Sequence, residues 1–184
     1  TGGGGTGGNA TYRTSGTTNT GGGGGGANDS VTGGNGGSGA LAQLFAATFV
    51  GHLERERPEL GAVALNTDAV LLTGAANNYG FDQVFAKQVR ALGQPGDVLL
   101  VVSASGQAEN VLHAIRAAHE RELSVVALTG QSGGKIRQEL RETDVHICVP
   151  SDKAVRIQEV HLLVLHTLCD GVDSQLLGEQ ETTE

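Results

Sequence analysis

From about residue 39 onwards, apolar positions follow two alternating spacings along the chain. Helical spacing, with an apolar residue every three or four positions, occupies residues 41–56, 68–78, 81–92, 107–121, 134–142 and 154–177. Short apolar runs stand between them at residues 61–65, 97–103, 124–129 and 144–149 and predict buried strands. Helices and strands that alternate in this way are typical of a parallel sheet covered by helices. The pattern therefore predicts an α/β fold.

The first 33 residues have a different character. Most of the glycines before residue 41 lie in this segment. It contains almost no apolar side chain that could be buried in a core. We expect a low-complexity N-terminal segment over residues 1–33 and one domain over residues 34–184. Two interpretations of the segment stay open, a flexible arm or a stretch whose residues are assigned in error, and we infer no function from it.

Charge and cysteine content narrow the classes of function. The formal net charge is -8, from 12 Lys+Arg against 20 Asp+Glu, and the chain has no basic run. Direct nucleic-acid binding is therefore not expected. Apolar runs are too short for a membrane span. Cys148 and Cys169 lie in apolar stretches, so we expect small buried hydrophobic side chains and a reducing, cytoplasmic compartment.

The clearest chemical signal is a strand that ends on serines, "VLLVVSASGQAENV" at residues 98–111. Ligands of open parallel sheets bind beyond the carboxyl ends of the strands, where Ser103 and Ser105 are expected. Two hydroxyls, a close backbone approach at Gly106 and the start of a helix favour a phosphate. The alternative is that either serine merely caps the next helix.

A second glycine-rich turn, "GGNGGSG" at residues 33–39, also precedes a helix and contains Ser38. Two such turns can converge on one ligand. The stretch satisfies the dinucleotide pattern GxGxxG, but no strand is predicted before it and no acidic residue stands at the expected distance. We therefore do not expect a nicotinamide cofactor.

Four stretches together resemble a known family. "GNGGS" before a helix, "GDVLLVVSASGQAENV", "VVALTGQSGG" and "VRIQEVHLLVLHTLCD" are similar to the sugar isomerase (SIS) domain, and most similar to the branch of phosphoheptose isomerases and DiaA proteins. The resemblance spans about residues 34–178. It implies a three-layer sandwich with a five-stranded, parallel, flavodoxin-like sheet, a homotetramer, and sites that lie between subunits.

The resemblance also implies roles for individual residues. Ser38, Ser103 and Ser105 would hold a sugar phosphate with help from Asn35, although Ala108 replaces a further hydroxyl. The implied reaction is the isomerisation of sedoheptulose 7-phosphate through an enediol, for lipopolysaccharide core heptose synthesis. It uses a carboxylate, a histidine and a zinc ion.

The final predicted helix carries the second set of implied site residues. By resemblance, Gln158 and His166 correspond to substrate-binding, metal-ligand and acid–base positions. They stand eight residues apart, an offset of about 80° around a helix, so both can reach one site. His161 lies nearby on the same predicted helix.

The helix after the "GNGGS" turn departs from the pattern of the catalytic branch. Leu44 stands where that branch has a metal-binding histidine and Thr48 where it has the catalytic glutamate, while Leu41 and Asn78 replace aspartates. Two hypotheses follow. The first is an isomerase, favoured by Gln158 and His166, whose expressed protein would carry histidine and glutamate at positions 44 and 48. The second is a DiaA-like protein without activity that binds the replication initiator DnaA.

Overall fold

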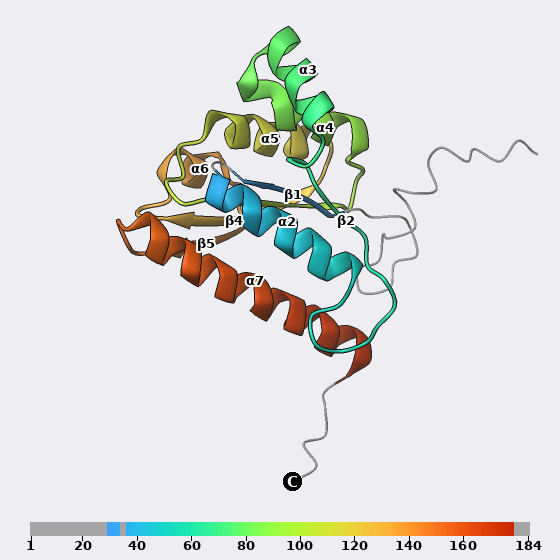
Figure 1. Cartoon of the computed structure of the whole chain (residues 1–184). Coiled ribbons are helices and arrows are strands. Elements are labelled where there is room, and N and C mark those ends of the chain that lie inside the picture. The colour runs from blue at the N-terminus through green and yellow to red at the C-terminus, as the bar shows by residue number, and fades with distance from the viewer. Residues whose placement is uncertain (1–28, 34–35, 179–184) are drawn as a thin grey trace, which may run out of the picture.

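The computed structural model describes residues 29–33 and 36–178, with side chains from residue 36 onwards, as a parallel sheet covered by helices on both faces (Figure 1). Its five strands pair in the order β2-β1-β3-β4-β5, and every pair is parallel. This is the strand order of flavodoxin-like folds. The elements in chain order are β1 (Asp29–Gly33), α2 (Gly36–Val50), β2 (Ala62–Ala64), α3 (Ala69–Tyr79), η1 (Phe81–Gln83), α4 (Val84–Leu92), β3 (Val98–Ser103), α5 (Glu109–Glu120), β4 (Ser124–Gly130), α6 (Gly134–Glu139), β5 (Val145–Val149) and α7 (Ala154–Leu177).

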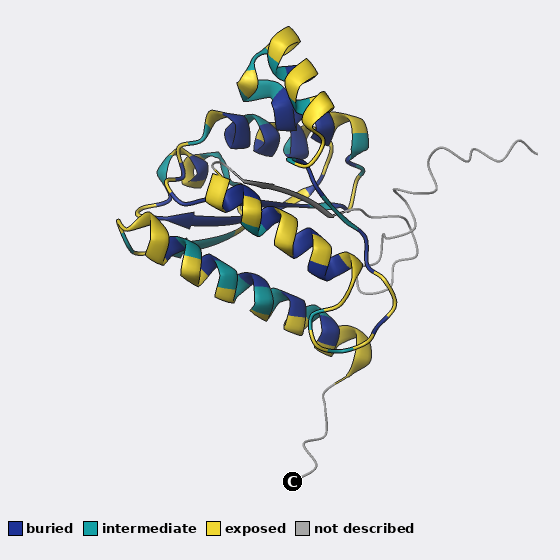
Figure 2. Cartoon of the chain, in the orientation of Figure 1, coloured by how far each residue is buried: buried dark blue, intermediate teal, exposed yellow. Residues whose placement is uncertain are grey.

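Strand β3 shows why the sheet needs a helix layer on each face. Its side chains point alternately to opposite faces, so Leu99 and Val101 join the core under α3, α4, α5 and α6, while Leu100 and Val102 join the core under α2 and α7. Both faces are buried (Figure 2), which explains the unbroken apolar run in the sequence. The predicted α/β sandwich with a flavodoxin-like sheet is confirmed.

Strand β1 was not expected from the pattern. Its sequence, DSVTG, has no apolar run. The strand nevertheless pairs on both sides, with β2 through Ser30↔Val63 and with β3 through Val31↔Leu100, because a parallel ladder is made by backbone groups. A strand therefore does precede the GxGxxG stretch, so one of the two arguments against a dinucleotide site was wrong. Residues 1–28 lie outside the described part of the chain.

Several predicted helix boundaries were also wrong. The first helix was expected over residues 41–56, but α2 begins at Gly36 and ends at Val50. The chain turns back after Val50, and the Arg57 guanidinium donates hydrogen bonds to the carbonyl oxygens of Thr48 (3.1 Å) and Phe49 (3.0 Å). These bonds satisfy carbonyl groups that the end of a helix leaves open. The helix predicted over 81–92 is split into η1 and α4.

The two cysteines differ in exposure. Cys169 is buried, and burial raises the pKa of its thiol to about 12, as expected for a small hydrophobic side chain. Cys148 is only partly buried, so the prediction of a buried thiol was wrong there.

Within residues 29–33 and 36–178, no helix has the length and apolar character that a membrane span requires.

Candidate functional site

The chain continues to opposite faces of the sheet after the carboxyl ends of β1 and β3. The strands are neighbours, with Gly33 opposite Val102. After β1 the chain enters α2, which packs beside α7 on one face, and after β3 it enters α5 on the other face. Ligands of open α/β sheets bind in the crevice at such a switch point. Asn35, predicted to help here, lies outside the described residues.

The three predicted serines belong to the elements that border this point. Ser38 is in the first turn of α2 and is fully buried, and Ser103 ends β3 with 2% exposure. Ser105 is exposed, and its Oγ accepts a hydrogen bond from the Gln107 backbone N–H at 3.3 Å. The structure thus places Ser38, Ser103 and Ser105 at the carboxyl-terminal end of the sheet, where β1 and β3 lead into α2 and α5.

The structure also decides the alternative that a serine caps α5. The N-cap residue of α5 is Ala108, which has no side-chain acceptor and makes no side-chain capping bond. Neither Ser103 nor Ser105 caps the helix, so that interpretation was wrong. A helix start without a side-chain cap suits an anion, because the first turn of a helix carries N–H groups and a positive dipole end.

The turn after β3 packs closely against the turn after β4. Gly106 has φ +66°, and a Cβ added there would lie 2.1 Å from the Gly133 carbonyl oxygen. The Ile136 N–H donates to the Gly106 carbonyl at 3.0 Å. Only glycine fits this position. No role was predicted for the residues after β4, although the glycine-rich string "GQSGG" at 130–134 was a signal for a tight turn.

Gln158 meets α2 at its first turn. A Cβ added to Gly37 would lie 2.3 Å from the Gln158 side-chain nitrogen, Nε2. The Gln158 amide therefore lies over the same helix turn that carries Ser38. The structure brings together these two residues, which the sequence places 120 positions apart.

His161 fastens α7 to the sheet. It is fully buried, and its Nε2 lies 2.9 Å from the Thr129 carbonyl oxygen, near the end of β4. Since a carbonyl only accepts, Nε2 must carry the proton. Burial lowers the pKa of His161, and its hydrogen bond to Thr129 holds α7 against the end of β4.

His166 lies further along α7, at the level of position 44 on α2. The two helices lie side by side (Figure 1) and share a direction, since Gly37 meets Gln158 while Arg57, bound to the end of α2, pairs with Asp173. Leu44 lies seven residues after Gly37 on α2, and His166 lies eight residues after Gln158 on α7. Both residues are therefore about 10 to 12 Å along their helix axes from the contact between Gly37 and Gln158.

The side chains of α2 at this level include no group that readily binds a metal ion or transfers a proton. Leu44 is 43% exposed and aliphatic. Thr48 is mostly buried, and its hydroxyl donates to the Leu44 carbonyl oxygen at 2.9 Å. Within the described ranges, no three His, Cys, Asp or Glu side chains are grouped so that they could hold a metal ion.

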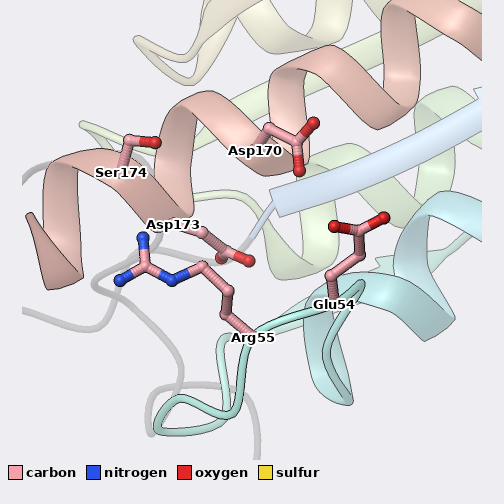
Figure 3. Close-up of a pocket in the computed structure, with 5 residues that line it drawn as sticks. All are labelled: Glu54, Arg55, Asp170, Asp173 and Ser174. Atoms are coloured by element: carbon pink, nitrogen blue, oxygen red, sulfur yellow. The ribbon is translucent and has the colours of Figure 1, made fainter. Parts of the chain in front are cut away.

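A separate cavity of about 230 Å³ lies at the other end of α7, between that helix and the loop after α2 (Figure 3). Its lining residues are Glu54, Arg55, Asp170, Asp173 and Ser174. Asp173 lies 15 residues beyond Gln158, about 22 Å along the helix. Its three carboxylates outnumber its single cation, so it does not suit a phosphate.

Comparisons with known proteins agree with this geometry. The family model described as "SIS domain" matches residues 30–130. The chain is 64% identical to a phosphoheptose isomerase from Azoarcus sp. over 147 residues, which cover 80% of this chain and 75% of the relative. It is 59% identical over 149 residues to one from Methylibium petroleiphilum, with coverages of 81% and 74%.

Solved structures give the same result. A phosphoheptose isomerase from Francisella tularensis superposes with a TM-score of 0.78 at 47% identity, and the match covers 81% of this chain and 78% of that one. One from Neisseria gonorrhoeae has a TM-score of 0.74 at 52% identity, with coverages of 80% and 77%.

Proposed function

Because the chain belongs to the SIS-domain family and, within it, to the phosphoheptose isomerases, we propose that it interconverts sedoheptulose 7-phosphate and D-glycero-D-manno-heptose 7-phosphate. The observation that carries the proposal is the cluster at the β1–β3 switch point. There Ser38 and Ser103 are both buried, and the Gln158 side chain of α7 lies over the first turn of α2, which carries Ser38.

The phosphate end of the substrate is assigned to the two serine turns. Hydroxyl groups of Ser38, Ser103 and Ser105 donate to its oxygens, and the uncapped first turn of α5 adds N–H groups and a positive dipole end. These interactions are independent of any basic side chain, which suits a chain with a net charge of -8.

The isomerisation itself moves hydrogen between neighbouring carbons. A base removes a proton from C1 of the ketose to give an enediol, a proton is added to C2, and the hydroxyl proton of O1 is exchanged for one on O2. His166 is the titratable side chain that α7 brings to the level of Leu44. Thr48 cannot act as a carboxylate base, so we expect slow turnover. General acid–base groups typically contribute about 10²- to 10⁴-fold.

The proposal is tested by binding and by solvent exchange. Calorimetry should detect binding of sedoheptulose 7-phosphate and none of unphosphorylated sedoheptulose. Incubation with the phosphate in D₂O should introduce carbon-bound deuterium, which an enediol requires and which mass spectrometry detects even at slow turnover. Absence of both binding and exchange would contradict the proposed function.

A single hydroxyl provides the sharper form of the binding test. The change Ser105→Ala removes one donor to a charged group, a loss of about 1.5 to 3 kcal/mol, or roughly tenfold to a hundredfold in Kd. Ser124→Ala is the matched control, since Ser124 is an exposed serine that begins β4, at the opposite, amino-terminal end of the strands. Equal Kd values for the two variants would remove Ser105 from the phosphate site.

The wider setting follows from the same family membership. We propose a homotetramer in the cytoplasm that serves lipopolysaccharide core heptose synthesis, with sites completed between subunits. Exposed apolar side chains support an assembly, among them Val70 (84%), Leu163 (65%) and Phe81 (63%). The alternative, a DiaA-like protein that binds DnaA, is not favoured, because the curated relatives are phosphoheptose isomerases.

A further inference from the structure

We propose that the sugar-phosphate site of this chain binds no resident zinc ion, and that the residues at positions 44 and 48 decide this. The inference rests on the proposed function for the identity of the site. Zinc, when bound in such a site, polarises the substrate oxygens as a Lewis acid. The residues present here do not suit the ion.

The first reason lies on α2. Zinc in proteins takes cysteine, histidine, aspartate or glutamate ligands, and a catalytic site needs three of them. Leu44 offers only carbon atoms, although its exposure of 43% leaves it accessible. Thr48 has a neutral hydroxyl that donates to the Leu44 carbonyl oxygen at 2.9 Å, within its own helix. Helix α2 thus contributes no ligand at this level.

The second reason lies on α7. His166 supplies one imidazole at this level. Gln158 supplies a neutral amide, and its nitrogen lies over Gly37 at the first turn of α2. His161 is fully buried and its Nε2 is bonded to the Thr129 carbonyl oxygen. At this level the described parts of α2 and α7 offer one imidazole, and nowhere among the described residues are three His, Cys, Asp or Glu side chains grouped so that they could hold a metal ion.

The family resemblance and the geometry together indicate which changes would create a zinc site. Position 44 is exposed on α2 and lies level with His166, and position 48 follows one helical turn later on the same side. The double change Leu44→His and Thr48→Glu adds an imidazole and a carboxylate at this level. With His166 these make three ligands of the types that zinc prefers, with a fourth position open to water or substrate.

The test measures zinc directly on the full chain. Tandem mass spectrometry of peptides that span residues 41–50 first checks that leucine and threonine stand at positions 44 and 48. The protein is then exposed to excess zinc, exchanged into metal-free buffer and measured by inductively coupled plasma mass spectrometry, beside a calorimetric zinc titration. We expect fewer than about 0.1 zinc ions per unsubstituted chain and about one zinc ion per chain of the double variant. The reason is that the unsubstituted chain offers one zinc ligand at this level and the double variant offers three.

The matched control is Gln43→His. It adds a histidine to the same helix, also at an exposed position, but about 100° away from position 44. It should bind no more zinc than the unsubstituted chain. Circular dichroism and the thermal midpoint of each variant report whether it is folded, which keeps a failure to fold apart from a failure to bind.

The outcomes separate this inference from the proposed function. About one zinc per unsubstituted chain would overturn the inference, as would a folded double variant that binds no more zinc than its parent. Calorimetry with sedoheptulose 7-phosphate on the same metal-free sample tests the proposed function by itself. Binding and deuterium exchange that persist unchanged in EDTA would support both.

Discussion

At the scale of single residues, His161 links the stability of the chain to pH. Burial lowers the pKa of this ring in the folded state, and burial also lowers the pKa of His146, with a further contribution from Arg137. In the unfolded chain both rings take up protons near pH 6.5, whereas the folded chain resists protonation. Unfolding therefore binds protons below about pH 6.5, and stability falls as the pH falls through that range.

Urea denaturation at pH 7.5, 6.5 and 5.5 measures this effect. The free energy of unfolding should fall slightly from pH 7.5 to pH 6.5 and more steeply from pH 6.5 to pH 5.5, with a limiting slope of about 1.4 kcal/mol per pH unit for each proton taken up. His161→Gln, which keeps an N–H donor for Thr129, should reduce the slope. An unchanged slope in the His161 variant would contradict the assignment.

Alanine substitutions at Gly106 and Gly96 distinguish two energetic costs of replacing glycine: a left-handed backbone and a steric clash of the added Cβ. Gly106→Ala imposes a left-handed backbone on alanine and drives its Cβ into the Gly133 carbonyl oxygen. Gly96→Ala imposes only the first cost, since φ is +91° and no atom lies within 4 Å of the added Cβ. We expect about 1 to 2 kcal/mol for Gly96 and clearly more for Gly106. Urea midpoints measure both, and equal losses would contradict the close contact between the two turns.

At the scale of elements, a buried ion pair joins α7 to the end of α2. The Arg57 Nε lies 2.5 Å from the Asp173 carboxylate, and both side chains are almost fully buried. The same guanidinium binds the last carbonyl groups of α2. Arg57→Met leaves a carboxylate buried without its cation, so it should cost about 3 to 5 kcal/mol. The double change Arg57→Met and Asp173→Leu should cost less than the sum of the single changes.

A double-mutant cycle by urea denaturation tests this prediction. The exposed pair Arg116–Glu139 is the control, because its side chains are 47% and 28% exposed. Solvent-exposed pairs contribute about 0 to 1 kcal/mol. Coupling energies of similar size in the two pairs would show that the buried Arg57–Asp173 ion pair does not stabilise the packing of α7 on α2 more than an exposed pair does.

At the scale of the whole molecule, strand order predicts how protection from hydrogen exchange is distributed. Strand β3 lies between two paired strands, whereas β2 and β5 are edges of the sheet. Amides of β3 should exchange only through global unfolding, and those of the three-residue β2 much faster. Hydrogen exchange with mass spectrometry measures this in the assembled protein. Equal protection of β2 and β3 would contradict the prediction and indicate that another subunit covers that edge.

The sequence predicted the parts of this molecule that depend on local pattern. Apolar runs located β3, β4 and β5, and Ser103 stands at the end of β3 as expected. It did not predict β1, because the ladder that holds it is made by the backbone and by neighbours far along the chain. Nor did it predict the return of Arg57 onto α2. The roles of Ser38, Ser103, Ser105, Gln158 and His166 stay predictions, since contacts locate a side chain without assigning its chemistry.

The switch point has a consequence for the design of inhibitors. Phosphate anchorage is assigned to the turns at the ends of β1 and β3, while positions 44 and 48 lie further along α2. A compound that engages only the turns would bind this chain and a relative with a different set of groups on α2 about equally well. If this chain binds no resident zinc ion, as proposed above, a compound whose potency depends on a zinc-binding group would not inhibit it. Pharmacological selectivity among such proteins is therefore to be sought along the body of α2.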